Sequence, residues 1–198
     1  MWMKNVAAAG LAALSLSACV APVGPVEVTR FHVPGPSPLG VGPIAVEAAA
    51  GADGASLEFS SYAGAVAREL VRLGYSERPP GAPSPQVALV RIERQTYRPD
   101  RRRGPVSVGV GGSTGSYGSG VGLGIGIDLS GPPPEQVETL LAVTVKDRAS
   151  GQALWEGRAS FTVKANSPLA ETQLGAAKLA EALFRGFPGR SGETIEVK

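Results

Sequence analysis

One stretch of the sequence alternates apolar and polar residues more regularly than any other, and it constrains the fold most. Between Ala153 and Ala165, one register holds Ala153, Trp155, Gly157, Ala159, Phe161 and Val163, and the other holds the charged or hydroxyl residues Glu156, Arg158, Ser160, Thr162 and Lys164. Period-2 alternation predicts a strand with one buried and one solvated face, which is typical of an antiparallel sheet. Val137 to Asp147 alternates in the same way, and we expect Arg148 to Gly151 to form the turn between these two strands.

Two other segments have the spacing of amphipathic helices. Ser56 to Leu73 places apolar residues largely at steps of three and four on one face, and these are Leu57, Phe59, Tyr62, Ala63, Val66, Ala67, Leu70 and Val71. Ser56 is a plausible N-cap, and Gly74 is the glycine that follows the helix. Ser167-Pro168 opens the second helix, because serine caps an N-terminus and proline suits the first helical position. The second helix is expected to end at the run Gly186-Phe187-Pro188-Gly189.

Further strands are expected on both sides of the first helix. They are Glu27 to Val33, Gly42 to Ala50 and Gln86 to Arg98, with a last short strand at Ile195 to Val197. Ser76 to Pro85 is expected to be a proline-rich loop. The order of elements predicts an α+β fold in two layers, in which a mostly antiparallel sheet carries two helices packed on one face.

Pro105 to Leu129 has an unusual composition and predicts a glycine-rich hairpin inserted in this fold. Valine, leucine and isoleucine alternate with glycine or serine in two runs, which a glycine and serine segment separates. The pattern fits two strands joined by a flexible loop. A glycine face lets another backbone approach closely, but glycine also weakens strands. We therefore expect this hairpin to be mobile or to form only against a partner.

The N-terminus has the features of an export signal. One lysine, Lys4, precedes the mainly apolar run Val6 to Leu16, which is too short to cross a bilayer as a helix. The run ends in Leu16-Ser17-Ala18-Cys19, which resembles the lipobox of bacterial lipoproteins. The resemblance implies cleavage before Cys19 and acylation of that cysteine. The alternatives are a short buried helix, or an ordinary signal peptide with a chance cysteine.

This interpretation divides the chain into three parts. Residues 1–18 are a signal peptide, 19–26 a lipidated tether rich in proline, and 27–198 a single folded domain. Val20, rather than aspartate, follows the cysteine, which by analogy with enterobacterial sorting favours the outer membrane. We expect the domain to face the periplasm of a bacterial cell envelope, with the membrane as a partner through the lipid on Cys19.

Composition excludes several classes of function. The formal net charge of +2 gives no case for a nucleic-acid partner. A single cysteine excludes an internal disulfide and a cysteine-rich zinc cluster. Neither a cofactor nor a metal ion is expected.

One catalytic motif occurs within the glycine-rich segment. Gly111 to Gly115 matches G-x-S-x-G, with Ser113 at the nucleophile position. A nucleophile elbow requires a strand before the serine, a helix after it and a later histidine. Here more glycine follows, and the only histidine, His32, lies upstream. We therefore expect no catalytic residues, and a serine-type hydrolase using Ser113 or His32 is an unfavoured alternative.

One basic concentration remains as a candidate contact surface. It starts at Arg91 and Arg94 and continues through the four residues expected to contact an anionic partner, Arg98, Arg101, Arg102 and Arg103. Lipid phosphates, lipopolysaccharide or cell-wall carboxylates are the expected partner chemistries. The competing interpretation is a solvated strand end and loop.

Short motifs across the mature chain resemble the DUF4136 family of bacterial lipoproteins. They are Leu70, Gly74 and Tyr75, then Val145-Lys146-Asp147 through Ala153–Ala159, and finally Phe187-Pro188. Pro85-Gln86 stands where an acidic residue is often found. The resemblance covers most of residues 27–190 and implies no catalytic residues.

These observations favour a non-catalytic, lipid-anchored envelope protein that binds another envelope protein or a cell-wall component. An auxiliary lipoprotein subunit of a lipid-transport or cell-wall synthesis machine is the alternative. Trp155 is expected to be a core anchor, and Asp147 and Gly151 are expected to shape the turn.

Overall fold

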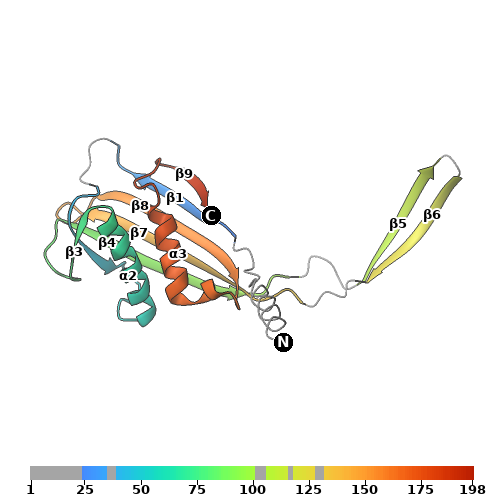
Figure 1. Ribbon diagram of the computed structural model, residues 1–198, viewed down its shortest axis with the longest axis horizontal. Helices are drawn as coiled ribbons and strands as arrows, with labels where there is room; N and C mark the ends of the chain where they lie inside the picture. The colour runs from blue at the N-terminus through green and yellow to red at the C-terminus, as the bar shows by residue number, and fades with distance from the viewer. Residues whose placement is uncertain (1–23, 35–38, 101–105, 116–117, 128–131) are drawn as a thin grey trace, which may run out of the picture.

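The computed structural model describes residues 24–34, 39–100, 106–115, 118–127 and 132–198. Their largest unit is a seven-stranded sheet in the order β3-β2-β4-β7-β8-β1-β9 (Figure 1). All neighbouring strands pair antiparallel except β2, which pairs parallel with both β3 and β4. The strands are β1 Val26–His32, β2 Gly42–Ala48, β3 Tyr75–Arg78, β4 Gln86–Tyr97, β7 Gln136–Asp147, β8 Ala153–Lys164 and β9 Glu193–Val197.

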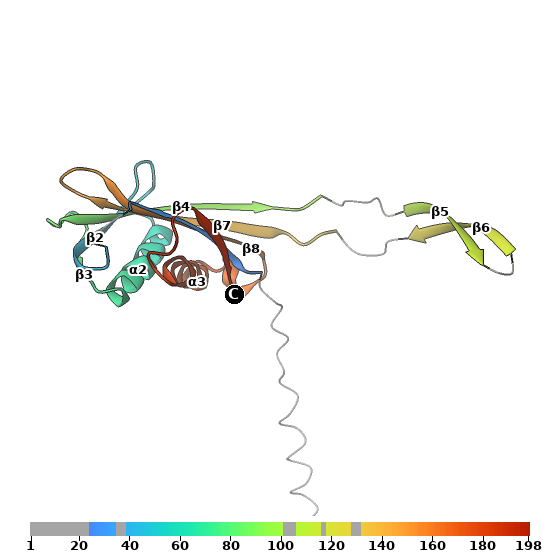
Figure 2. The same ribbon diagram turned by 90° about the horizontal axis from the view of Figure 1, so that it is seen from above.

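Two helices form the second layer. α2, Leu57–Arg72, and α3, Thr172–Phe184, both lie on one face of the sheet (Figure 2). No helix of the described residues covers the other face. The side chain of Ser56 accepts a hydrogen bond from the backbone N–H of Phe59 at 3.0 Å, as expected for an N-cap. The two-layer α+β fold is therefore confirmed.

The glycine-rich segment forms a separate two-stranded sheet. β5, Val106–Gly115, pairs antiparallel with β6, Gly118–Ile127. In chain order this hairpin is inserted between β4 and β7, which also pair with each other along their whole length. Its register sets Gly109 opposite Gly124 and Val110 opposite Leu123.

Three local expectations were wrong. Ser76 to Arg78, expected in a loop, belong with Tyr75 to strand β3, because this segment pairs with β2, which lies more than thirty residues earlier in the sequence. Pro168–Ala170 forms a separate 3-10 turn, η1, and α3 begins only at Thr172, because Glu171 between them has an extended backbone. On α2, the expected apolar face included Leu57 and Val71, but these side chains are 88% and 49% exposed.

The core is organised around Trp155, which is fully buried on the helix side of β8. Its indole stacks on Phe184 of α3 with a centroid separation of 5.3 Å and contacts Phe187 at 5.2 Å. The indole N–H donates to the carbonyl oxygen of Pro188 at 3.0 Å. Trp155 therefore joins β8, α3 and the segment after α3, and the expected core role is confirmed.

Gly157 provides the space that this tryptophan needs. A Cβ atom at position 157 would lie 2.2 Å from Cη2 of Trp155 and 2.8 Å from Cδ1 of Leu183. Both distances are far below van der Waals contact, so the indole ring occupies the volume that a side chain at 157 would fill.

Arg30 is a buried cation that was not expected from the alternation of β1. Its side chain lies on the inner register with Val26 and Val28, while Phe31 on the other register is 50% exposed. Arg30 donates through Nε to the carbonyl oxygen of Leu183 at 2.9 Å and through Nη2 to that of Ala182 at 3.0 Å. Burial lowers the pKa of Arg30, and Glu193 acts in the opposite direction. A cation at the C-terminus of α3 also complements the helix dipole.

We predict that Gly157→Ala destabilises the protein, because the new methyl group displaces the Trp155 ring from its stack. The expected loss is about 1–3 kcal/mol in the free energy of unfolding, the usual cost of overpacking a core. Urea denaturation followed by tryptophan fluorescence measures it. Gly64→Ala, in α2 with no atom nearer than 3.7 Å, is the matched control and should be neutral or stabilising. Equal stability of the two variants would contradict this account of Gly157.

Candidate functional site

The sheet has two distinct ends, and several features gather at one of them. β4 finishes at Tyr97, which pairs with Gln136 at the start of β7, and Gln136 pairs in turn with Lys164 at the finish of β8. β1 begins at this end too, where Val26 pairs with Val197 near the finish of β9. The β5–β6 hairpin connects Tyr97 with Gln136, so we call this end the hairpin end.

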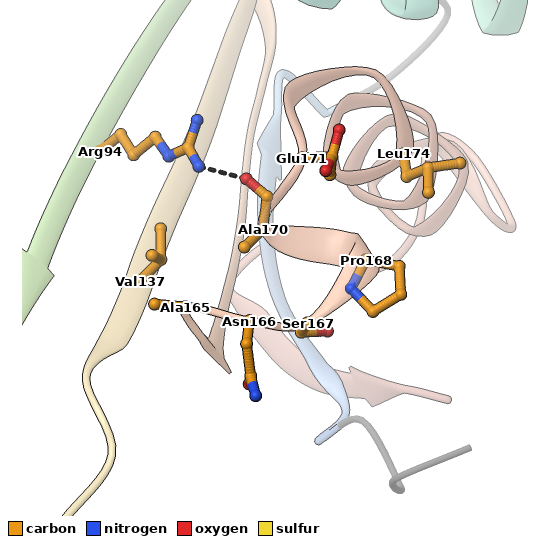
Figure 3. A pocket seen from close by; sticks show the side chains of 9 residues that line it. All are labelled: Arg94, Val137, Ala165, Asn166, Ser167, Pro168, Ala170, Glu171 and Leu174. Atoms are coloured by element: carbon orange, nitrogen blue, oxygen red, sulfur yellow. Dashed lines mark hydrogen bonds between the residues drawn. The ribbon is translucent and has the colours of Figure 1, made fainter. Parts of the chain in front are cut away.

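A hollow of about 440 Å³ lies at the hairpin end, between β4, β7 and the segment that leads into α3 (Figure 3). Arg94 enters it from β4 and Val137 lines it from β7. Apolar and polar groups are mixed in its wall, and Leu174 at its rim is 52% exposed. The remaining lining residues are Ala165, Asn166, Ser167, Pro168, Ala170 and Glu171.

The guanidinium of Arg94 is the one cation lining this hollow, and it is engaged by its own chain. It donates to Oε1 of Glu58 at 3.3 Å, to Oγ1 of Thr172 at 3.2 Å, and to the carbonyl oxygen of Ala170. These bonds connect β4 with the first turns of α2 and α3. Arg94 therefore acts first as a structural connection between the two layers.

The helix-free face of the sheet contains a second hollow, of about 670 Å³. In register, Arg91 of β4 and Arg158 of β8 lie on either side of Ala142 in β7. The other charged residues that line it are Glu93, Lys146 and Glu156. Arg91 donates to the carbonyl oxygen of Ala50 at 2.7 Å. Among the residues the structure describes, no ion pair joins the charged side chains of this hollow, which leaves charges of both signs facing solvent.

The expected basic concentration is divided by the pleat of β4. Arg91 lines the helix-free face, whereas Arg94 contacts the helices, because residues three apart in a strand lie on opposite faces. Arg98 is exposed just beyond the end of β4. The three arginines at positions 101–103 lie outside the described residues, as does Cys19, so contact of these residues with a partner stays a prediction.

The two candidate hydrolase residues belong to different sheets. His32 lies in β1, and its ring nitrogens Nδ1 and Nε2 are 3.1 Å and 3.3 Å from the carbonyl oxygens of Val33 and Gly189. Ser113 lies inside β5, where its backbone pairs with Gly120. The motif is thus followed by a second strand, whereas a nucleophile elbow requires a sharp turn into a helix.

The remaining residue picked out from the sequence, Asp147, shapes the β7–β8 turn. Its carboxylate accepts from the backbone N–H of Ser150 at 2.8 Å and from its hydroxyl at 2.7 Å. These two hydrogen bonds lower the pKa of Asp147. Gly151 adopts a φ of +72° in the same turn, so the expected role of both residues is confirmed.

The part of the chain that the structure describes holds no cluster of three or more His, Cys, Asp and Glu residues placed to bind a metal ion. Within the same residues, no helix has the length and hydrophobicity needed to cross a membrane.

With the fold established, its class can be stated: residues 37–189 match the model of DUF4136, a domain of unknown function, and the chain belongs to this family. One relative is the uncharacterized protein ZMO1243 of Zymomonas mobilis, which is 43% identical over 63 residues. That match covers 32% of this chain and only 24% of the relative's length.

Solved structures resemble the fold only distantly. A PDZ domain protein from Parabacteroides distasonis aligns with a TM-score of 0.50 and 10% identity, over 88% of this chain and 39% of that one. A PelC dodecamer from Paraburkholderia phytofirmans aligns with a TM-score of 0.38 and 13% identity, over 79% of this chain and 96% of that one.

The residues that carry the family resemblance maintain the fold. Trp155, Gly157 and Phe187 meet in the aromatic core. Gly74 ends α2 with a φ of +107°, and a Cβ there would lie 2.8 Å from the carbonyl oxygen of Gly40. Leu70 is likewise buried. These motif residues therefore maintain the fold, and the two surface hollows remain as the candidate functional sites.

We predict that Arg94→Ala lowers the free energy of unfolding by about 1 kcal/mol, because three acceptors lose a partly exposed charged donor. Arg94→Lys should restore only part of this loss, since one ammonium cannot reproduce the spread of the guanidinium. Arg98→Ala, at an exposed position on the same segment, is the control and should change stability by less than about 0.5 kcal/mol. Chemical denaturation tests all three; equal stability of Arg94→Ala and Arg98→Ala would refute the structural role.

Proposed function

We propose that this protein is a lipid-anchored component of the bacterial cell envelope, held in the outer membrane by an acylated Cys19, with its domain facing the periplasm. The observation that carries the proposal is Leu16-Ser17-Ala18-Cys19 directly after an apolar run that is too short to span a bilayer. Two or more acyl chains give stable anchoring, whereas one gives reversible binding.

The position of the first strand supports this proposal. β1 begins at Val26, so residues 20–25 form the connection to Cys19. A fully extended chain spans at most about 3.3–3.6 Å per residue, which gives this connection a reach of roughly 20–25 Å. An acylated Cys19 therefore holds the hairpin end of the sheet near the membrane.

We further propose that the domain works by binding another envelope protein or a cell-wall component rather than by catalysis. The support comes from a contrast between polar groups that bond within the chain and polar groups that face solvent. Arg94, Asp147 and the ring of His32 all meet groups of their own chain. On the helix-free face, by contrast, Arg158 and Glu156 are exposed around a hollow wide enough to receive side chains or sugar groups of a partner.

We predict that Cys19→Ser abolishes acylation. The test is metabolic labelling with an alkyne fatty acid, in which the wild type should carry label and the variant none. Ser17→Ala, which keeps a small residue at that position, is the matched control and should be labelled like the wild type. A second variant places residues 20–198 behind a conventional cleavable signal peptide and should be found in the soluble periplasmic fraction. An unlabelled wild type would overturn the anchor.

A further inference from the structure

The hairpin segment is free of charge over an unusual length. Residues 104–127 contain no Asp, Glu, Lys, Arg or His, although 18% of the whole chain is charged. Three consecutive arginines, Arg101 to Arg103, stand immediately before this segment, and Tyr117 lies between its two strands in the sequence. Uncharged aliphatic segments with flanking arginine and tyrosine are typical of elements that meet a membrane interface.

The register of β5 and β6 sorts the hairpin into two chemically different faces. Ser107 pairs with Gly126, Gly111 with Gly122 and Ser113 with Gly120, so one face consists of glycine and serine positions. Seven of the ten positions on the other face are aliphatic, and the remaining three are Gly112, Thr114 and Ser119. The aliphatic positions are Val106, Val108, Val110, Val121, Leu123, Ile125 and Ile127.

These aliphatic positions share one face of a sheet that has only two strands. An isolated two-stranded hairpin is at best marginally stable in water. Within the described residues, β5 and β6 pair only with each other, in a sheet separate from the seven-stranded one. A contiguous aliphatic face is typical of an interaction surface.

The topology places the base of the hairpin at the end of the sheet where β1 begins. The hairpin leaves the main sheet at Tyr97 and Gln136, and β1 begins at the same end. Here the inference rests on the proposed function, since acylation of Cys19 holds the hairpin end near the bilayer. Strands of this length extend about 33 Å at roughly 3.3 Å per residue, so the hairpin can reach the lipid surface.

We propose that the β5–β6 hairpin is a second membrane contact, which lies in the bilayer interface with its aliphatic face against the acyl chains. The glycine and serine face then meets water, and the preceding arginines meet lipid phosphates. The hairpin lies in the interface rather than crossing the bilayer, because the outer edges of β5 and β6 carry unpaired N–H and C=O groups that hydrocarbon cannot satisfy. Hydrated headgroups can satisfy them.

The lone cysteine makes the test direct. Because Cys19 is acylated in the anchored protein, a cysteine introduced elsewhere carries the only reactive thiol. We would label Val108→Cys, Leu123→Cys and Ile125→Cys on the aliphatic face, and Ser107→Cys and Ser113→Cys on the opposite face, with an environment-sensitive dye. The labelled, acylated proteins are placed in phosphatidylcholine–phosphatidylglycerol vesicles that carry a nitroxide quencher at a shallow acyl position. Ala149→Cys, exposed in the β7–β8 turn at the opposite end of the sheet, is the solvent control.

We expect quenching at the three aliphatic positions to exceed that at the two serine positions by at least about threefold, as an interfacial element with one apolar face requires. Equal quenching on both faces would overturn the proposal. So would protection of Leu123→Cys that is already present without vesicles and rises with protein concentration, because a second copy would then cover the face. Stronger quenching by a probe at the bilayer centre would show a spanning segment and would likewise overturn it.

A second set of variants separates this proposal from the lipid anchor. Leu123→Asp with Ile125→Asp should still be acylated on Cys19 but should lose vesicle-dependent protection of a label at Val108→Cys. Trp155 fluorescence reports whether the main domain remains folded. If Cys19 proves not to be acylated, residues 20–198 with the same labels are mixed with vesicles instead. Binding that Arg101–103→Gln weakens would then uphold the hairpin contact without the anchor, and an absence of binding would refute it.

Discussion

The packing of Trp155 over Gly157 is the contact on which the two-layer arrangement depends. The indole lies on a strand residue without a side chain, and this allows α3 to approach β8 closely enough for Phe184 to stack on it. Phe187 and the carbonyl group of Pro188 then close the cluster from the segment that follows the helix. Arg30 adds hydrogen bonds from β1 to the last carbonyl groups of the same helix. One helix is thereby fixed to two strands that are distant in sequence.

The sequence predicted those elements whose conformation depends on their own pattern of apolar and polar residues. β7 and β8 alternate cleanly because each has one buried and one solvated face, and Ser56 marks the start of α2. β3 escaped prediction because its four residues, Tyr75–Arg78, owe their conformation to a parallel neighbour rather than to their own sequence. The burial of Arg30 could not be predicted from the sequence, because its hydrogen-bond acceptors are carbonyl groups of a helix more than 150 residues later.

The candidate sites also combine features that the local sequence indicates with features that depend on distant parts of the chain. Arg91 and Arg94 are three residues apart in a predicted strand. Because residues an odd number apart in a strand lie on opposite faces, the sequence already indicated that these two arginines point to different sides of the sheet. The partners of Arg94, by contrast, come from the starts of two helices and were not encoded near it. No periodicity indicated the hollow around Ala142, because it arises where a small residue in β7 lies in register between arginines of the two neighbouring strands. Such a site can be recognised only when the pairing of the strands is known.

The length of β4, β7 and β8 has a consequence for where a partner would meet the domain. Each has twelve residues, which corresponds to about 40 Å at roughly 3.3 Å per residue. If acylation of Cys19 holds the hairpin end at the bilayer, as proposed, and the strands run along the membrane normal, the opposite end, with the Asp147–Gly151 turn, would stand about 40 Å further from the lipid. Contacts at the two ends would then take place at different heights above the membrane, so one small domain could bridge the bilayer surface and a layer of the envelope above it.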